Sequence, residues 1–302
     1  MPKVVIVGSI AFDDLKTPFG EMNSALGGSA VYASIACSLF SKAGIVSVVG
    51  DDFPAKHLEL LKSKGIDTSG IEVKKGEKTF HWKGEYGFDL NTAKTIKTDL
   101  NVLSSFNPVL SDEFRDAEYL FLGNIAPEFQ LSVLSQMKKR PKLVVADTMN
   151  MWIDSRRGKV LEAVEKVDIA LMNDAEARSL FNTPNLVAAA REILKLDSEV
   201  AIIKKGEHGC IMFTDGSFFA CPGYPLEKVM DPTGSGDSFG GSLIGYLAKT
   251  GDFSHSNMRK AIVYASCVAS FNAEDFSVNR LKNVTISDVE KRFKEFGGFA
   301  KF

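Results

Sequence analysis

The chain lacks an excess of positive charge, which separates it from most nucleic-acid-binding domains. Its 302 residues carry 36 Lys and Arg against 38 Asp and Glu, a formal net charge of −2. Proteins that bind nucleic acid usually show a basic footprint, so we expect no nucleic-acid partner. A polyanionic ligand would have to be held by local devices, such as backbone amides and a few cations.

Cysteine, histidine and long apolar runs are also scarce. The four cysteines stand at positions 37, 210, 221 and 267, without C-x-x-C spacing and without a histidine cluster. This favours reduced thiols over a disulfide framework or a zinc site. No signal peptide or membrane-spanning stretch is recognisable, so the sequence predicts a cytoplasmic protein without a membrane partner.

Short β-branched runs alternate with helical segments along most of the chain. Val4–Val7, Ile45–Val49 and Val200–Lys204 are typical of buried strands, and helical spacing separates such runs. The alternation predicts an α/β fold, a single domain over 1–302, with a mostly parallel sheet between helical layers. A hairpin that turns at Asp215-Gly216 is expected after the last parallel strand.

The alternation breaks between about residues 71 and 102. Residues 78–89 alternate aromatic and polar side chains without a helical period. We expect antiparallel strands there. Together, 11–22 and 72–104 are predicted to form a small β-sheet lid. Because open edge strands invite pairing, a homodimer through the lid is a further expectation.

Three of the predicted parallel strands end in a polar residue, namely Asp147, Asn173 and Lys204. Open parallel sheets bind ligands beyond the carboxyl ends of their strands. Any one of these residues alone is better explained as an ordinary polar residue facing a loop. Three of them at one edge favour a binding crevice.

The segment 230–247, MDPTGSGDSFGGSLIGYL, places glycines at a helix start. Phe239, Leu243 and Tyr246 recur at helical spacing, which predicts a helix from about Gly236. The free amides and the dipole of such a helix favour a phosphate or developing negative charge. Asp237 is then either a first-turn acid that stabilises the helix or a general base, and the open positions around it favour the base.

Asp231-Pro-Thr-Gly-Ser-Gly-Asp237 resembles the D-T-x-G-A-G-D signature of the PfkB (ribokinase-like) carbohydrate and nucleoside kinases. Four further segments resemble motifs of that family, in its order: Gly8–Asp13, Gly27-Gly28, the N-x-x-E of Asn173–Glu176, and Lys204–Gly209. The resemblance implies the family's ribokinase-like three-layer α/β/α fold with a β lid. It also implies an ATP-dependent kinase acting on a small-molecule hydroxyl.

The resemblance assigns a role to each matched residue. Asp237 corresponds to the catalytic base, and Gly234, Ser235 and Gly236 correspond to the anion hole. Asp13, with the backbone of Gly27 and Gly28, would hold substrate hydroxyls. The residues that the resemblance places on the ATP side are Asn173, Glu176, Lys204, Gly206, Gly209 and Thr233.

The resemblance further implies two metal ions. Asn173 and Glu176 would organise Mg²⁺ through its waters, which agrees with the preference of Mg²⁺ for oxygen ligands. Some members bind K⁺ beside the anion hole, and Asp231 and Thr233 would contribute to such a site here.

The acceptor pocket departs from ribokinase. Ala11 stands where ribokinase has an asparagine, and Ser29 and Tyr32 replace a lysine and an asparagine. Phe12, Tyr32 and Trp82 offer apolar faces instead, which suit a planar base. Packing within the lid or a dimer contact explains these aromatic residues about equally well.

A nucleoside acceptor is therefore slightly favoured, and the chain resembles the family's bacterial nucleoside-kinase-like members more than ribokinase itself. A sugar kinase on the same catalytic residues is the alternative. A catalytically silent nucleotide-binding regulator is a third reading, which an intact Asp237 disfavours.

Overall fold

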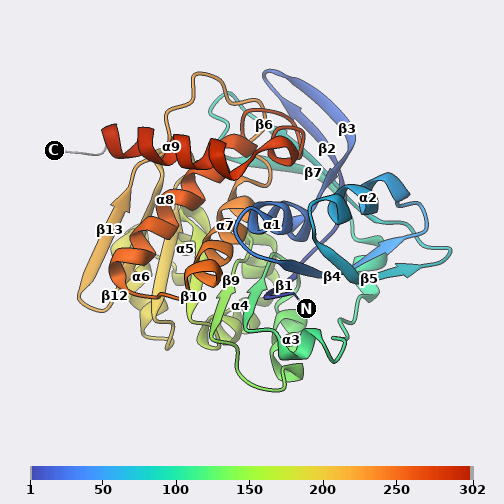
Figure 1. Ribbon diagram of the computed structural model, residues 1–302, viewed down its shortest axis with the longest axis horizontal. Coiled ribbons are helices and arrows are strands. Elements are labelled where there is room, and N and C mark those ends of the chain that lie inside the picture. Colours follow the sequence, from blue (N-terminus) through green and yellow to red (C-terminus); the bar gives the residue numbers. More distant parts are fainter. Residues whose placement is uncertain (1, 300–302) are drawn as a thin grey trace.

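The β-branched runs form a nine-stranded sheet in the computed structural model, which describes residues 2–299 (Figure 1). Its strands are, in spatial order, β13 (Ser217–Cys221), β12 (Cys210–Thr214), β11 (Val200–Lys204), β10 (Ile169–Asn173), β9 (Leu143–Ala146), β8 (Tyr119–Leu122), β1 (Val4–Val7), β4 (Ala43–Gly50) and β5 (Asp67–Lys74). Neighbours are parallel from β11 to β5, whereas β12 is antiparallel to both β11 and β13. The predicted hairpin and mostly parallel sheet are confirmed.

Helices cover both faces of this sheet, which explains why all four residues of β1 are fully buried. One core unites the sheet with α1 (Ser29–Ser38), α2 (Ala55–Ser63), α7 (Ser235–Thr250), α8 (His255–Asn272) and α9 (Ile286–Phe299). The core on the other face includes residues of α3 (Pro127–Gln136), α4 (Asn150–Glu165), α5 (Asp174–Phe181) and α6 (Leu186–Leu194). The three-layer α/β/α architecture expected from the sequence is therefore present.

A second sheet of four strands lies beside the main domain, near α2 in Figure 1. Its order is β3 (Gly20–Gly27), β2 (Ala11–Thr17), β6 (Phe80–Tyr86) and β7 (Ala93–Asp99). The β2–β3 and β6–β7 hairpins are antiparallel, and the parallel β2–β6 pair joins them. We call this four-stranded sheet the lid sheet.

The strands of the lid sheet differ in their limits from the expected 11–22 and 72–104. Residues 72–74 belong to β5 and pair with β4 in the large sheet. Residues 101–105 form a 3₁₀ helix, whereas β3 continues to Gly27. The aromatic alternation of 78–89 marked β6 correctly. β5 is half-exposed and charged and lacks the apolar run of the buried strands, so its sequence did not indicate that it belongs to the large sheet.

The lid sheet joins the main domain through a buried threonine. Thr79 precedes β6, and Asp52 Oδ1 accepts hydrogen bonds from its backbone N at 2.8 Å and its Oγ1 at 2.6 Å. Asn101, which follows β7, donates to the Thr79 carbonyl at 2.8 Å. Both ends of the β6–β7 hairpin are thus fixed to one point.

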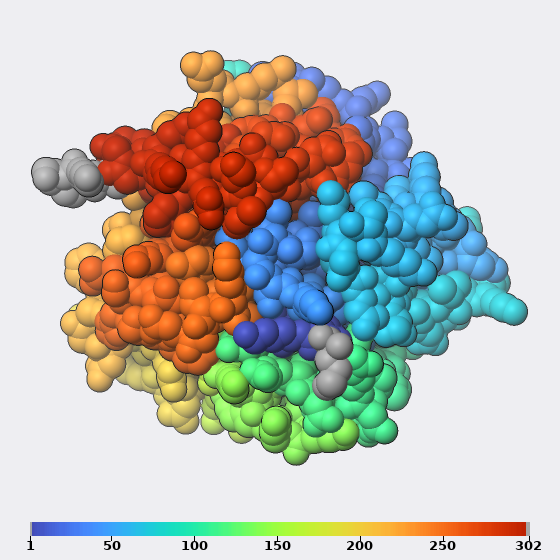
Figure 2. Space-filling view, in the orientation of Figure 1, coloured from blue at the N-terminus to red at the C-terminus, as the bar shows by residue number. Residues whose placement is uncertain are grey.

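Figure 2 shows the C-terminal helices in orange and red lying against the N-terminal segment in blue, in agreement with the packing of α7 on α1. Within residues 2–299, every helix is too short or too polar to cross a bilayer. All four cysteines are free thiols and buried.

Candidate active site

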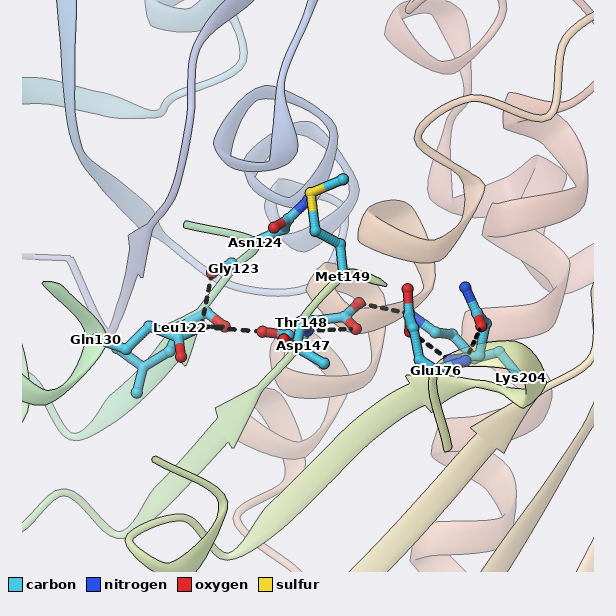
Figure 3. A network of polar contacts seen from close by, with 10 residues as sticks. Leu122, Gly123, Asn124, Gln130, Asp147, Thr148, Met149, Glu176 and Lys204 are labelled. Atoms are coloured by element: carbon cyan, nitrogen blue, oxygen red, sulfur yellow. Dashed lines mark hydrogen bonds and ion pairs between the residues drawn. The ribbon is translucent and has the colours of Figure 1, made fainter. Parts of the chain in front are cut away.

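Three polar residues at the carboxyl ends of neighbouring strands lie together, as the sequence predicts. Lys204 ends β11 and Asp147 follows β9 (Figure 3). Asn173 ends β10, the strand between them. The Lys204 Nζ lies 2.5 Å from Asp147 Oδ2, with both side chains largely buried. Burial disfavours the ammonium, but the carboxylates of Asp147 and Glu176 raise the pKa of Lys204, so it remains a cation.

A glutamine that the sequence analysis did not single out fixes this edge of the sheet. Gln130 of α3 donates from Nε2 to the carbonyls of Leu122, Gly123 and Asp147, at 3.3, 2.9 and 2.9 Å. It therefore ties the end of β8 to the end of β9 beside the Asp147 carboxylate (Figure 3). An isolated polar residue in an amphipathic helix gives no warning of this role.

The N-x-x-E motif forms a capping box at the start of α5. Asn173 Oδ1 accepts from the Glu176 backbone N at 2.8 Å, and Glu176 Oε2 accepts from the Asn173 backbone N at 2.7 Å. Burial, reinforced by the charge of Asp147, raises the pKa of Glu176 to about 8. Burial therefore disfavours the charged form of this carboxyl group, whereas a nearby cation favours it.

The glycine-rich segment starts α7 at Ser235, close to the predicted start. Gly234 adopts a left-handed conformation with φ 77°, and a side chain there would overlap the ring of Tyr32. A Cβ on Gly236 would stand 3.1 Å from Lys204 Nζ. A cation and a helix N-terminus therefore meet at one place, which suits an anion.

Asp237 lies in the first turn of α7 within this group of charges. Burial, reinforced by the nearby Asp147 and opposed by Lys204, raises its pKa to about 7. A carboxyl group with this pKa can take up and release a proton near neutral pH, as a general base must.

A second carboxylate, Asp13 on β2, faces the same region. Its side chain is buried, and a Cβ on Gly27 would overlap the Asp13 carboxylate, so this position needs glycine. Burial, together with the charges of Asp231 and Asp237, raises the pKa of Asp13 well above its usual range. Gly28, with φ 95°, packs on the Ser9 carbonyl.

Tyr32 also belongs to this cluster, but in a different way from the expected one. Its ring packs against Gly234, and its side chain is 1% exposed. Its hydroxyl is buried without a hydrogen-bond partner, near Asp13, Asp231 and Tyr86. The free end of Tyr32 is therefore its hydroxyl rather than an aromatic face.

Trp82 lies on the lid sheet in register with Asp13. It packs against the buried cluster of Leu15, Ala25 and Phe276, and its Nε1 donates to Thr95 Oγ1 at 3.2 Å. Phe12 lies elsewhere: its ring centroid is 5.9 Å from that of Phe53 and 6.5 Å from that of His57.

The first aspartate of the signature is fully buried and bound by backbone amides. Asp231 accepts from the backbone N of Thr233 at 2.9 Å and of Ser277 at 3.0 Å. The hydroxyl of Thr233 donates to Tyr86, the last residue of β6, at 3.0 Å. Asn272 donates to the Thr233 carbonyl at 2.7 Å, while its own Oδ1 is buried without a partner.

The predicted nucleotide turn follows β11. Gly206 and Gly209 have φ of 56° and 80°, and a side chain on Gly209 would overlap the Cys221 carbonyl. Across the described part of the chain, no cluster of three or more His, Cys, Asp and Glu side chains is arranged to hold a metal ion unaided.

Comparison with known proteins adds the decisive observation. The family model for pfkB carbohydrate kinases matches residues 1–283. The chain belongs to this family. It is accordingly a phosphotransferase, and Asp237 lies within the matched residues.

Relatives of this pfkB kinase act on different small molecules. A cytidine kinase from Thermococcus kodakarensis is 31% identical over 252 residues, which cover 82% of this chain and 89% of the relative. A nucleoside kinase from Methanocaldococcus jannaschii has the same fold, with a TM-score of 0.79 at 22% identity, covering 97% of this chain and 98% of its own. An E. coli protein assigned as ribokinase II, solved with ATP and Mg²⁺, gives a TM-score of 0.81 at 19% identity, covering 98% and 100%.

Proposed function

We propose that this pfkB kinase moves the γ-phosphoryl group of ATP to a hydroxyl of a nucleoside, with Asp237 as the general base. The observation that carries the proposal is the position of Asp237. It lies at the N-terminus of α7, has a pKa of about 7, and shares a charge cluster with Asp13 on one side and Lys204 on the other.

The residues divide the work of phosphoryl transfer. Asp13 orients the acceptor, and Asp237 accepts the proton of the attacking hydroxyl as its oxygen bonds to phosphorus. The bridging P–O bond breaks and ADP leaves. The amides of Gly234 and Gly236, with the Lys204 ammonium, stabilise charge on the transferred group. The Ser235 amide, which was expected to belong to the same anion hole, instead donates to the Pro232 carbonyl at 3.1 Å.

The charged and polar groups of this site suit ATP and Mg²⁺. Lys204 beside Gly236 provides the cation for a phosphate, with Gly206, Gly209 and Thr233 around the nucleotide. The oxygens of Asn173 and Glu176 would hold Mg²⁺ through waters, since the capping box already uses the single side-chain oxygen of Asn173 and one of the two of Glu176. When bound, ATP and Mg²⁺ supply the phosphoryl group and neutralise its charge.

One feature supports an acceptor with a sugar hydroxyl, and a second supports a flat base. The unpartnered hydroxyl of Tyr32 would bond to a sugar hydroxyl beside Asp13, which removes the cost of its isolation. Trp82 and its apolar neighbours would form a wall for a flat base. The 31% identity to a cytidine kinase agrees with this reading.

Charged pairs cover part of the lid sheet. Lys16 pairs with Glu85 at 2.8 Å, and His81 lies 3.1 Å from Asp14. Such a surface does not favour the lid-to-lid homodimer considered from the sequence. We therefore assign Trp82 to the acceptor pocket and Phe12 to packing against α2. We also propose that the kinase is cytoplasmic.

A K⁺ site at Asp231 and Thr233 is part of the proposal. Asn272, the last residue of α8, bonds to the Thr233 carbonyl, and its unpartnered Oδ1 would supply a further oxygen. Activity in potassium chloride should exceed activity in sodium or choline chloride at equal ionic strength. Equal rates in the three salts would remove K⁺ from the proposal.

The sugar-kinase alternative shares every catalytic residue, so substrate panels decide between the two. ADP release should be followed with ATP and Mg²⁺ over ribonucleosides, deoxyribonucleosides, pentoses and hexoses. Turnover of a nucleoside at least tenfold faster than that of any free sugar supports the proposal. Preference for a sugar contradicts it, and no turnover of any acceptor favours a silent regulator.

A further inference from the structure

The tip of the lid hairpin reaches the nucleotide side of the crevice, beyond the acceptor. β6 and β7 are joined by a loop that contains Asn91. The Asn91 Nδ2 donates to Glu207 Oε1 at 3.0 Å, and Asn91 Oδ1 accepts from the Glu207 backbone N at 3.5 Å. A second ionisable group, His208, has its Nε2 3.8 Å from the same Glu207 oxygen.

The contact also involves the glycine before Glu207. A Cβ on Gly206 would overlap Asn91 Oδ1, and the φ of 56° independently favours glycine there. Both the contact with the lid and its own backbone conformation therefore favour glycine at position 206. On its other side the turn rests on Cys221–Gly223, where a Cβ on Gly209 would collide with backbone.

We propose that Asn91 is a positioning residue for the nucleotide, which holds the turn from Gly206 to Gly209 in its phosphate-facing shape when the lid is closed. This inference rests on the proposed function, because it takes that turn to be the nucleotide side. Asn91 does not touch the reacting atoms and acts through the Glu207 backbone and side chain.

The lid hairpin therefore contacts both the acceptor side and the nucleotide side of the crevice. Near its base, Trp82 packs beside the acceptor residue Asp13; at its end, Tyr86 bonds to Thr233 at 3.0 Å, and Asn91 bonds to Glu207. Of these contacts, the bond between Asn91 and Glu207 is the one that holds the turn on the nucleotide side. The solvent-exposed bonds of Asn91 are weak, as suits a contact that must open at each turnover.

The test measures nucleotide and acceptor separately. Asn91→Ala should raise the Kd for MgADP, measured by calorimetry, and the KM for ATP by about two- to tenfold, the range of one exposed hydrogen bond. The acceptor KM should stay unchanged. Asn91→Asp should have a larger effect, since its carboxylate would face that of Glu207. The neighbouring exposed Thr92 offers a matched control, and Thr92→Ala should leave all three constants unchanged.

A double-mutant cycle locates the effect. If Asn91 acts through Glu207, Asn91→Ala combined with Glu207→Ala should be no worse than the more damaging single change. An unchanged MgADP Kd in Asn91→Ala overturns the inference, and so does an equal rise in both KM values, which would indicate general loosening of the lid. An unsubstituted chain that binds no MgADP refutes the proposed function itself.

Discussion

Lys204 Nζ and Asp147 Oδ2 lie 2.5 Å apart although β10 separates the strands that present them. Two further carboxyl groups, those of Glu176 and Asp237, influence the same ammonium. One buried cation thus faces three acids. Burial and mutual repulsion keep protons on part of this group, and a second cation would displace them.

Replacing Asp237 should separate binding from chemistry. Asp237→Asn keeps the shape of the side chain but cannot accept a proton, so kcat should fall by about a hundredfold or more. The Kd for MgADP, measured by calorimetry, should change little. Near-native turnover in this variant would show that Asp237 is only a first-turn acid of α7.

The pH dependence of the reaction should reveal the influence of Lys204. A base with a pKa of about 7 is active when deprotonated, so kcat/KM for the acceptor should rise with pH through about 7. Lys204 lowers the pKa of Asp237, so Lys204→Met should move this rise to higher pH. Lys205→Met is the matched control and should leave the profile in place. An unshifted profile in Lys204→Met would mean that the rise of kcat/KM with pH comes from the titration of another group.

Stability should change with pH in the direction that the site dictates. The pKa of Asp237 is raised from 3.8 to about 7, so between these values the folded chain binds more protons than the unfolded one. Asp237 therefore weakens the folded state as pH rises through this window, and Asn at this position avoids the loss. Asp237→Asn should melt a few degrees higher than the unsubstituted chain at pH 8, with no difference at or below about pH 4. A lower melting temperature at pH 8 would contradict this assignment.

Trp82 should govern the acceptor and not ATP. Trp82→Ala removes the ring that packs with Leu15, Ala25 and Phe276, so the acceptor KM should rise about tenfold or more, the scale of a lost aromatic wall. The KM for ATP should rise far less. If instead the acceptor KM is unchanged and a dimer dissociates in sedimentation, Trp82 serves an interface.

The hydroxyl of Tyr32 should contribute to binding of the acceptor. Tyr32→Phe keeps the ring against Gly234 and removes only an atom that lacks a partner, so the fold should retain its stability. The acceptor KM should rise about five- to tenfold if this hydroxyl bonds to the sugar. An unchanged acceptor KM would show that the hydroxyl faces no ligand.

The fold and the edge of the crevice follow from short-range signals. Strand runs that end in Asp147, Asn173 and Lys204 need only the geometry of a parallel sheet to bring these residues together. The start of α7 was likewise readable from its glycines. The N-x-x-E motif also matches a capping box, so its local structure was predictable without any reference to metal.

The interior of the site was harder to predict because it depends on contacts between distant segments. Asn91 and Glu207 are 116 positions apart, and Tyr86 and Thr233 are 147 apart. No local pattern announces such pairs. Tyr32 shows the same limit: the sequence indicated an aromatic residue near the acceptor, but only its packing on Gly234 shows which end is free.

The positions of Asp13 and Asp237 in the sequence also determine when, during synthesis, the chain can acquire activity. Asp13 belongs to the lid sheet, which is incomplete until β7 has been made, whereas Asp237 is contributed by a segment near the other end of the chain. A nascent chain that emerges from the ribosome therefore has an acceptor-side carboxylate long before it has a base. Premature termination before α7 yields a product that lacks Asp237, and under the proposed function this product cannot carry out phosphoryl transfer even if its sheet has folded.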